Sequence, residues 1–372
     1  MKLPVVIAAA LLASLVVAAD AATYDWQLPR GFTEPAVPAD NPMSTAKVAL
    51  GRRLFFEPKL SVTGKFSCAS CHAPERAFAD QRGVSIGATG AALPLNAIAL
   101  VNVAYNVSYG WSKPAVRSLE AQMLEPLLND HPVEMGMKGR EQRVLAELAA
   151  DESYAGAFAA AFPAEPAPTF EHLVKAIAAF ERTLISGHSA FDRYVFGGDH
   201  AALSEQAKRG MDLFFAPDVG CANCHSGFNF SGNWRDAQGA TGEPTFASNG
   251  TSEERIRVPT LRNVALTAPY MHDGRFKDLA AVLDHYAHPG THVDTRLHTL
   301  KVDPAQRQAL IEFLESLTDE TFVAATLAST SAATPSHPSA TTPAPSPAPR
   351  GKVGMGARLE PAATSARAAP SP

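Results

Sequence analysis

The sequence predicts a mainly α-helical fold made of two related domains. Apolar residues recur at helical spacing, as in residues 171–186, where Leu173, Ile177, Phe180 and Leu184 fall near one face. Strand-like alternation is scarce. A short motif also occurs twice, each time ahead of a Cys-x-x-Cys-His unit. These observations predict two helical domains of the same construction, with long loops around the two units.

Residues 1–21 have the pattern of an export signal. Lys2 supplies a positive charge, the apolar run that follows is too short to cross a bilayer comfortably, and Ala19-Asp20-Ala21 offers small residues for cleavage. We expect cleavage after Ala21, with an uncleaved anchor as the alternative. No later segment is long and apolar enough to span a membrane. The sequence therefore predicts an exported, periplasmic protein without a transmembrane segment once the signal is cleaved.

All four cysteines lie in the two Cys-x-x-Cys-His units. An exported protein commonly places four cysteines in two disulfides. This spacing instead allows two thiols to bond to the vinyl groups of one haem while the next histidine ligates its iron. Zinc is the competing interpretation, but it needs four ligands around one point, and each unit supplies two thiolates and a histidine. We predict two covalent haem c groups, bound by Cys68, Cys71, Cys221 and Cys224, with His72 and His225 as axial ligands.

The repeated motif is Gly-x-x-Leu-Phe-Phe, at residues 51–56 and 210–215, and an Ala-Lys pair precedes both copies. Ser44 and Ser204 stand where helix N-caps are expected. We therefore predict a short helix in each domain, with its Leu-Phe-Phe end near the edge of a haem or, alternatively, in the core alone. A further helix is expected over residues 141–150.

Composition bounds the domain organisation. The 372 residues are 46% hydrophobic, which is enough for two domains with cores of their own. The formal net charge of −5 gives no basic surplus, so no nucleic-acid partner is expected. The last part of the chain is rich in Ala, Pro, Ser and Thr, and we expect it to be disordered, as a solvated tail or a partner-docking segment. The predicted division is a signal peptide (1–21), an N-terminal cytochrome c-like domain (22–195), a C-terminal cytochrome c-like domain (196–323) and a disordered tail (324–372).

Two haems suit either an electron carrier or an enzyme, and the sixth ligand of each iron separates the two classes. A carrier saturates both irons, usually with Met or His, whereas an enzyme leaves one coordination position open. From Val258 to Gly274 the sequence reads VPTLRNVALTAPYMHDG. This segment resembles the signature of the bacterial di-haem cytochrome c peroxidases and the related MauG enzymes. The resemblance extends from about Pro42 to Leu317 and leaves out the signal and the tail.

The resemblance implies an unusual ligand for the C-terminal haem. The peroxidases place a methionine fourteen residues after the histidine that His272 matches, and this position is Tyr286 here, which resembles MauG. A phenolate oxygen favours ferric and higher oxidation states. His285 or His288 is the alternative ligand. The resemblance thus implies a low-spin C-terminal haem with a tyrosine ligand.

The N-terminal haem is implied to be high-spin and open to hydrogen peroxide. Many of the peroxidases carry a distal histidine eight residues before the asparagine that Asn96 matches, and this position is Ala88 here. Glu134 matches the family's distal glutamate, an acid/base for the O–O bond cleavage, and Gln122 matches its distal glutamine. The spacing between them is longer than usual, which raises His131 as a further distal group. Glu134 as a surface carboxylate is the alternative.

Two other groups are implied to lie between the haems. Trp111 matches the family tryptophan that relays an electron hole, although a core aromatic residue is the alternative. Asn96, Thr267 and Pro269 match the family's calcium site, where an amide and backbone carbonyls act as hard oxygen donors. These residues could instead only cap loops.

A closer resemblance is to the MbnH-like enzymes, in the segments 24–32 and 131–137. It implies that hydrogen peroxide drives the haems to a high-valent bis-ferryl state, which oxidises a tryptophan of a partner protein of the MbnP type to kynurenine, or another aromatic residue. One alternative is a di-haem cytochrome c peroxidase that takes electrons from a small cytochrome or cupredoxin. A non-catalytic electron-transfer cytochrome is the other.

Overall fold

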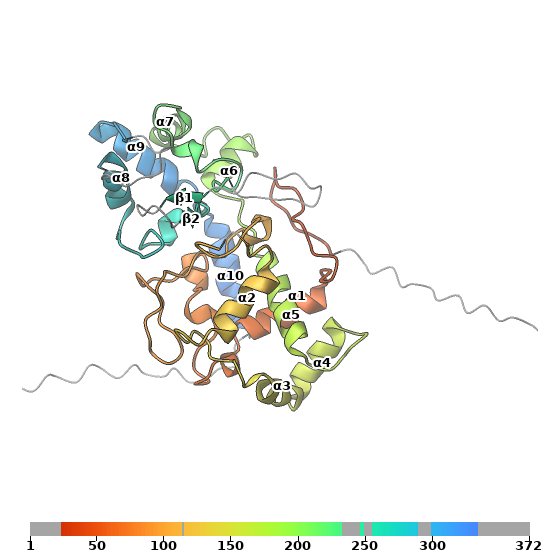
Figure 1. Cartoon of the computed structure of the whole chain (residues 1–372). Coiled ribbons are helices and arrows are strands. Elements are labelled where there is room, and N and C mark those ends of the chain that lie inside the picture. Colours follow the sequence, from red (N-terminus) through yellow and green to blue (C-terminus); the bar gives the residue numbers. More distant parts are fainter. Residues whose placement is uncertain (1–23, 114, 233–245, 249–254, 289–298, 334–372) are drawn as a thin grey trace, which may run out of the picture. The chain divides into compact units, whose positions relative to one another are not determined.

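The structure is a computed structural model that describes residues 24–113, 115–232, 246–248, 255–288 and 299–333. The expected signal peptide lies outside these residues. Within them the protein is mainly helical, as predicted, with ten α-helices and one two-stranded hairpin (Figure 1). None of the described helices has the length and apolar character that a membrane span requires.

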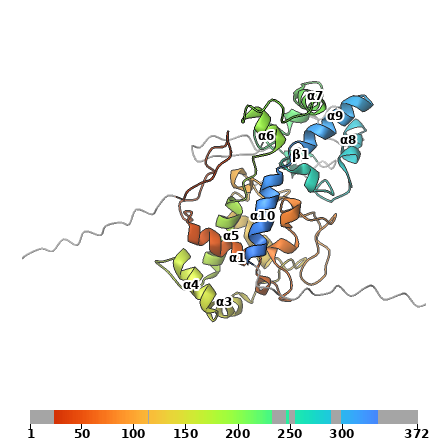
Figure 2. The same ribbon diagram turned by 180° about the vertical axis from the view of Figure 1, so that it is seen from behind.

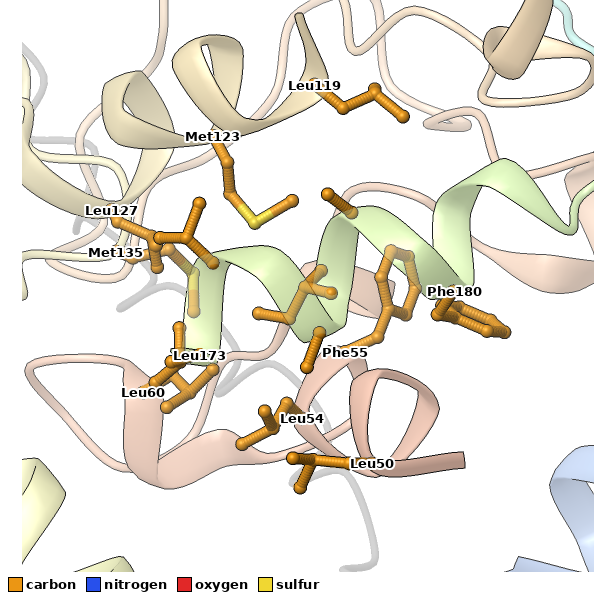
Figure 3. Packing of buried hydrophobic residues seen from close by; sticks show 14 of the residues in the cluster. Leu50, Leu54, Phe55, Leu60, Leu119, Met123, Leu127, Met135, Leu173 and Phe180 are labelled. Carbon is orange, nitrogen blue, oxygen red and sulfur yellow. The ribbon is translucent and has the colours of Figure 1, made fainter. Parts of the chain in front are cut away.

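Five helices form the first group, and α5 lies at its centre. They are α1 (Thr45–Phe55), α2 (Leu119–Leu128), α3 (Glu141–Ala149), α4 (Glu152–Ala161) and α5 (Phe170–Arg182). α5 packs against both α1 and α2, and apolar side chains from all three helices fill the space between them (Figure 3). The predicted face of α5 is buried, including Leu173 and Ile177. The helix ends before the predicted Ser186 because Thr183, its C-cap, turns its hydroxyl back to the Phe180 carbonyl at 2.7 Å.

The second group is built on α7 and α9. It contains α6 (Ala190–Val195), α7 (Glu205–Phe215), α8 (Leu279–Ala287) and α9 (Pro304–Glu315), with α9 in contact with both α7 and α8. The hairpin of β1 (Phe246–Ser248) and β2 (Arg255–Arg257) is antiparallel, with Ala247 opposite Ile256. The buried apolar residues form two clusters, one within residues 50–184 and the other within 191–317. The exact division at residues 195 and 196 stays a prediction.

The repeated motif specifies the same helix crossing twice. Ser44 and Ser204 cap α1 and α7 as predicted, each accepting a hydrogen bond from a backbone N–H of the first turn. A Cβ at Gly51 would overlap the carbonyl oxygen of Ala176 in α5, and a Cβ at Gly210 would overlap that of Ala309 in α9. Each glycine therefore allows two helix backbones to approach closely, which explains why the motif begins with one.

The disordered tail was predicted to begin at residue 324, but the first part of this segment is helical. Helix α10 (Glu320–Ala333) continues through the first residues of that segment. Alanine and leucine favour a helix, and the first proline after α9 is Pro335. Phe322 also anchors the helix, since its ring lies 6.1 Å from that of Phe78 in the first group. Figure 2 shows α10 extending from the α9 side to the helices of the first group. Residues 334–372 lie outside the described residues.

Candidate haem-binding and redox site

The two Cys-x-x-Cys-His units have the same local structure. Each forms a 3-10 turn, η2 (Cys68–Ser70) and η5 (Cys221–Asn223). In the first, the Cys68 carbonyl accepts hydrogen bonds from the N–H groups of Cys71 at 3.2 Å and His72 at 2.9 Å; the Cys221 carbonyl does the same at 3.3 and 3.0 Å. None of the four cysteines forms a disulfide. Each turn thus gathers two thiols and a histidine, the set that a covalent haem c requires.

The same backbone contact orients both histidines. The ring Nδ1 of His72 lies 3.0 Å from the Phe78 carbonyl oxygen, and that of His225 lies 2.9 Å from the Phe230 carbonyl oxygen. A carbonyl only accepts hydrogen bonds, so Nδ1 carries the proton and Nε2 is left as the donor atom for iron. Phe78 and Phe230 both adopt the left-handed conformation, with φ of 59° and 51°, which turns these carbonyls toward the rings. Burial lowers the pKa of both histidines and keeps them neutral, as ligation requires.

A cavity of about 290 Å³ lies beside the second unit. Its wall contains Cys221, Cys224 and His225, and Tyr286 of α8 also lines it. Most of the other lining residues are apolar, such as Leu283. The thiols, the oriented histidine and the apolar wall of this cavity fit a haem. Each of the two units has the residues to hold one haem.

Tyr286 faces this cavity from α8. It shares a helix face with Leu279 and Leu283, which are buried. Burial, together with the nearby thiols Cys221 and Cys224, raises the pKa of Tyr286 to about 12, so the phenol lies among the groups of the second unit. The predicted ligand is therefore inside the cavity.

The two alternative ligands are placed differently. His285 also lines the cavity, and its ring lies 5.1 Å from that of Phe276. His288 is exposed beyond the end of α8, and its Nδ1 lies 3.2 Å from the Asp284 carbonyl. Among the three candidates, Tyr286 and His285 remain near the second unit.

The predicted distal residues of the first unit are close together along the backbone. The N–H of Ala88 donates to the Glu134 carbonyl at 2.7 Å, and a Cβ at Gly87 would overlap the Val133 carbonyl. Burial raises the pKa of the Cys71 thiol most, and the charges of Asp80 and, to a smaller extent, Glu134 raise it further, so the Glu134 carboxylate lies near the first unit. Burial raises the pKa of Glu134 itself, which favours a carboxyl group able to hold a proton.

Gln122 lies on α2, and the segment that carries Glu134 is attached to the same helix. Gln122 is half-buried, one turn before Pro126, whose carbonyl accepts a hydrogen bond from the N–H of Met135 at 2.9 Å. His131 does not join this group: its side chain is 93% exposed and its Nε2 lies 4.0 Å from Asp130. The insertion that contains His131 therefore forms an exposed turn rather than a part of the distal pocket.

Trp111 lies where the two halves of the chain meet. Its indole Nε1–H donates to the Asn96 carbonyl at 2.8 Å, and its ring centroid is 6.4 Å from that of His272. The N–H of Asn96 in turn donates to the His272 carbonyl at 2.8 Å. Trp111 also lines the cavity of the second unit. The tryptophan is thus held between the segment of Asn96 and residues 258–274, the signature segment, which contains His272.

The three residues expected to bind calcium line the same cavity. The amide Nδ2 of Asn96 donates to the Arg82 carbonyl at 2.7 Å, which leaves its Oδ1 as an acceptor. The Thr267 hydroxyl donates to the Val264 carbonyl at 3.1 Å. Pro269 follows two residues later. An amide oxygen and backbone carbonyls are donors that suit a hard cation.

Sequence reasoning missed some residues that the structure brings to the site. Phe78 and Phe230 act through their backbone carbonyls, which leave no side-chain signal in a sequence. Arg257 is 3% exposed and lines the cavity of the second unit. The sequence offered one indication of its importance, which is its position directly before the signature segment.

Comparisons with known proteins identify the relatives of this chain. A family profile described as di-haem cytochrome c peroxidase matches residues 45–200. The methylamine utilization protein MauG of Methylorubrum extorquens is 36% identical over 293 residues, which cover 76% of this chain and 81% of that protein. The cytochrome c peroxidase Ccp of Escherichia coli is 39% identical over 261 residues, which cover 66% of this chain and 54% of that protein.

A solved structure shares the fold. It is the crystal structure of a MauG-like protein associated with microbial copper homeostasis, with a TM-score of 0.75 and 36% identity over 81% of this chain and 97% of that chain. The fold and the two units define a haem-dependent oxidoreductase with two haem c groups. The chain belongs to the family of di-haem cytochrome c peroxidases and MauG.

Proposed function

We propose that this protein is a periplasmic MauG-like enzyme that uses hydrogen peroxide to oxidise a tryptophan of a partner protein to kynurenine. The partner is a small exported protein of the MbnP type. The observation that carries the proposal is the phenol of Tyr286 in the cavity of the second unit, where the peroxidases have a methionine. The solved MauG-like relative that is associated with copper homeostasis supports the same assignment.

The overall reaction balances with hydrogen peroxide as its only oxidant. One tryptophan and two molecules of hydrogen peroxide give N-formylkynurenine and two molecules of water. Hydrolysis then releases formate and leaves kynurenine. The partner's tryptophan is oxidised, and the peroxide oxygen is reduced.

The haems, when bound by the two units, supply the electron-transfer chemistry. The chain's own residues then have separate tasks. Glu134, whose pKa is raised by burial, holds the proton that moves between the peroxide oxygens, and Gln122 helps to orient the peroxide. Tyr286 would hold the iron of the second unit through its phenol oxygen, losing its proton on ligation, and would thereby stabilise the oxidised metal. Trp111 would carry an electron hole between the two sites, since an indole is readily oxidised.

We further propose a calcium ion at Asn96, Thr267 and Pro269. The Oδ1 acceptor of Asn96 and the neighbouring backbone carbonyls support it, and water molecules would complete the coordination shell. The ion would hold the Asn96 segment, and therefore the Nε1 partner of Trp111, in place.

Reduction of hydrogen peroxide with electrons from a small cytochrome or cupredoxin is the second candidate function. The 39% identity with the peroxidase of Escherichia coli favours it. Ala88 in place of a distal histidine and Tyr286 in place of a methionine favour the first candidate instead. A purely electron-transferring cytochrome is the third candidate, and it requires both irons to be saturated.

One experiment separates the three functions. The holoprotein is mixed with hydrogen peroxide and a purified MbnP-type partner, and the partner is analysed by mass spectrometry. Conversion of tryptophan to kynurenine is expected, together with one high-spin and one low-spin haem in the ferric electron paramagnetic resonance spectrum. Rapid oxidation of a reduced cytochrome with an unmodified partner would identify a peroxidase, and two low-spin haems would identify an electron carrier.

A further inference from the structure

Arg257 is a buried cation whose charge the described protein residues do not balance. It ends β2, it is 3% exposed, and its Nε–H donates to the Gly110 carbonyl at 3.1 Å. No described carboxylate lies within ion-pair distance of its guanidinium. Burial lowers the pKa of Arg257 to about 10, which still leaves it protonated at neutral pH. A buried guanidinium is costly without an anion, so a partner from outside the described chain is expected.

Two other buried arginines each pair with a carboxylate, although each also has one guanidinium nitrogen without a hydrogen-bond partner among the described residues. Arg262 is 1% exposed and binds both carboxylate oxygens of Asp192 at 2.9 Å. Arg182 binds both oxygens of Glu120 at 2.8 Å. Arg257 is as deeply buried as these two, but among the described residues its guanidinium has a carbonyl partner and no carboxylate partner.

Arg257 lies at the cavity of the second unit. The residue lines the same cavity as Cys221, Cys224 and His225. Arg275 is the other arginine among the described lining residues, and Asp273 already pairs with it at 3.0 Å. No Asp or Glu occurs among the described lining residues. A haem bound through its vinyl groups carries two propionate carboxylates, which are anions of the kind that this wall lacks.

Arg257 also holds the loop that carries Trp111. Its backbone N–H donates to the Trp111 carbonyl at 2.7 Å, in addition to the bond from Nε to Gly110. Gly110 has a φ of 76°, the left-handed region in which a glycine is least strained. Two adjacent carbonyls of this loop are therefore fixed by one residue of the C-terminal half.

We propose that Arg257 is a positioning residue that pairs with a propionate of the C-terminal haem and fixes that haem relative to Trp111. The guanidinium neutralises the propionate, and the bonds to Gly110 and Trp111 tie the same residue to the loop of the tryptophan. The pairing requires only that the second unit binds a haem. Its consequence for hole transfer rests on the proposed function, in which Trp111 is the relay.

The test is the midpoint potential of the low-spin haem in the holoprotein, measured by spectroelectrochemical titration of Arg257→Gln and Arg257→Lys. A cation near the iron stabilises the ferrous state. The glutamine variant should therefore have a lower midpoint potential, and the lysine variant should restore most of the difference. Arg255→Gln is the control, because it removes the same charge from the exposed start of the same strand and should leave the midpoint unchanged. A glutamine variant that keeps both haems and the wild-type midpoint would overturn the proposal.

A second measurement decides the question if the glutamine variant loses a haem. The redox-difference infrared spectrum contains the carboxylate bands of the propionates. Replacement of a guanidinium by the ammonium of Arg257→Lys should shift one of these bands, and an unchanged spectrum would contradict the pairing. Neither readout uses the partner protein. A shifted potential in an enzyme that leaves the partner's tryptophan intact would thus contradict the proposed function while the propionate pairing stands.

Discussion

At the scale of single residues, the two halves of the site differ although their haem-binding turns are the same. The backbone carbonyls of Phe78 and Phe230 orient His72 and His225 alike. The differences lie in the neighbouring side chains, with Glu134 near the first unit and Tyr286 near the second. One copy therefore has a group that can move protons, and the other has a group that can ligate iron.

The acid/base role of Glu134 predicts a large kinetic effect. Glu134→Gln keeps the shape of the side chain but cannot take up a proton from peroxide, so the reaction of the ferric enzyme with hydrogen peroxide should slow by about 100-fold or more. Stopped-flow absorbance of the haem bands measures this rate. Glu125→Gln is the control. Glu125 also raises the pKa of Glu134, but its carboxylate is paired with Lys113 at 2.9 Å and is given no role in proton transfer. Equal rates for wild type and Glu134→Gln would remove Glu134 from the mechanism.

Glu181 predicts a dependence of stability on pH. It is 6% exposed, its Oε2 has no hydrogen-bond partner among the described residues, and burial raises its pKa from 4.5 to about 8. Between these two values the unfolded chain is ionised at this position while the folded protein holds a proton. Stability should therefore fall as pH rises from about 4.5 to 8, with a slope of at most about 1.4 kcal/mol per pH unit from this group.

Glu181→Gln should remove that part of the pH dependence. The free energy of unfolding is measured by denaturant titration of the holoprotein at pH 6 and pH 8. The difference between the variant and the wild type should be larger, in favour of the variant, at pH 8 than at pH 6. The same substitution at exposed Glu152 serves as the control. Parallel profiles for wild type and Glu181→Gln would mean that the buried carboxyl is already compensated when the haem is bound.

At the scale of elements, glycine at the two helix crossings is a steric requirement. Gly51→Ala would place a methyl group against the Ala176 carbonyl, and α1 would have to move away from α5. We expect a loss of about 1–3 kcal/mol in the free energy of unfolding. Gly156→Ala is the matched control, since Gly156 lies in α4 with open space around it and should gain up to about 1 kcal/mol. Thermal unfolding of both variants measures the contrast. A similar change in stability for the two variants would refute the steric requirement at Gly51.

The elements that the sequence predicted well are those with a local signal. α1, α3, α5 and α7 have apolar periodicity or a serine N-cap, and they form where expected. α4 and α10 were missed because both are rich in alanine, which favours a helix without giving it an apolar face. α10 further depends on Phe322 reaching the first group, and a contact over such a distance in sequence has no local pattern.

The same distinction applies to the site. The cysteines and histidines follow from spacing alone, and the resemblance supplied Tyr286, Glu134, Gln122 and Trp111. The exposure of His131 could not be predicted, since it depends on how the inserted residues turn between Asp130 and Val133. Arg257 could not be predicted either, because only its burial distinguishes it from a surface arginine.

At the scale of the whole molecule, one buried carboxylate connects segments from both halves. Asp319 is fully buried and accepts hydrogen bonds from the backbone N–H groups of Gly187 at 3.0 Å and His188 at 2.8 Å. Its own N–H donates at 2.8 Å to Asn263, in the signature segment. The pKa of Asp319 is below its usual value, because the hydrogen bonds it accepts, the first from Thr321, outweigh its burial. The residue thus joins the end of the first group, the second unit's signature segment and the start of α10.

Asp319→Asn tests whether this connection stabilises the whole chain. An asparagine replaces one acceptor oxygen by a donor, so the N–H groups of Gly187 and His188 lose their charged partner, and we expect a loss of about 3 kcal/mol in the free energy of unfolding at neutral pH. Because the depressed pKa keeps the carboxylate ionised, the difference should be fully present above pH 4 and should shrink as the solution is made more acidic. Chemical denaturation followed at both haems should also change from one shared transition to two separate ones. Ser316→Ala, which removes a hydroxyl that bonds within its own turn, is the control. A variant in which both haem signals still change together would show that the halves are coupled through other contacts, such as those of Arg257 with the Trp111 loop.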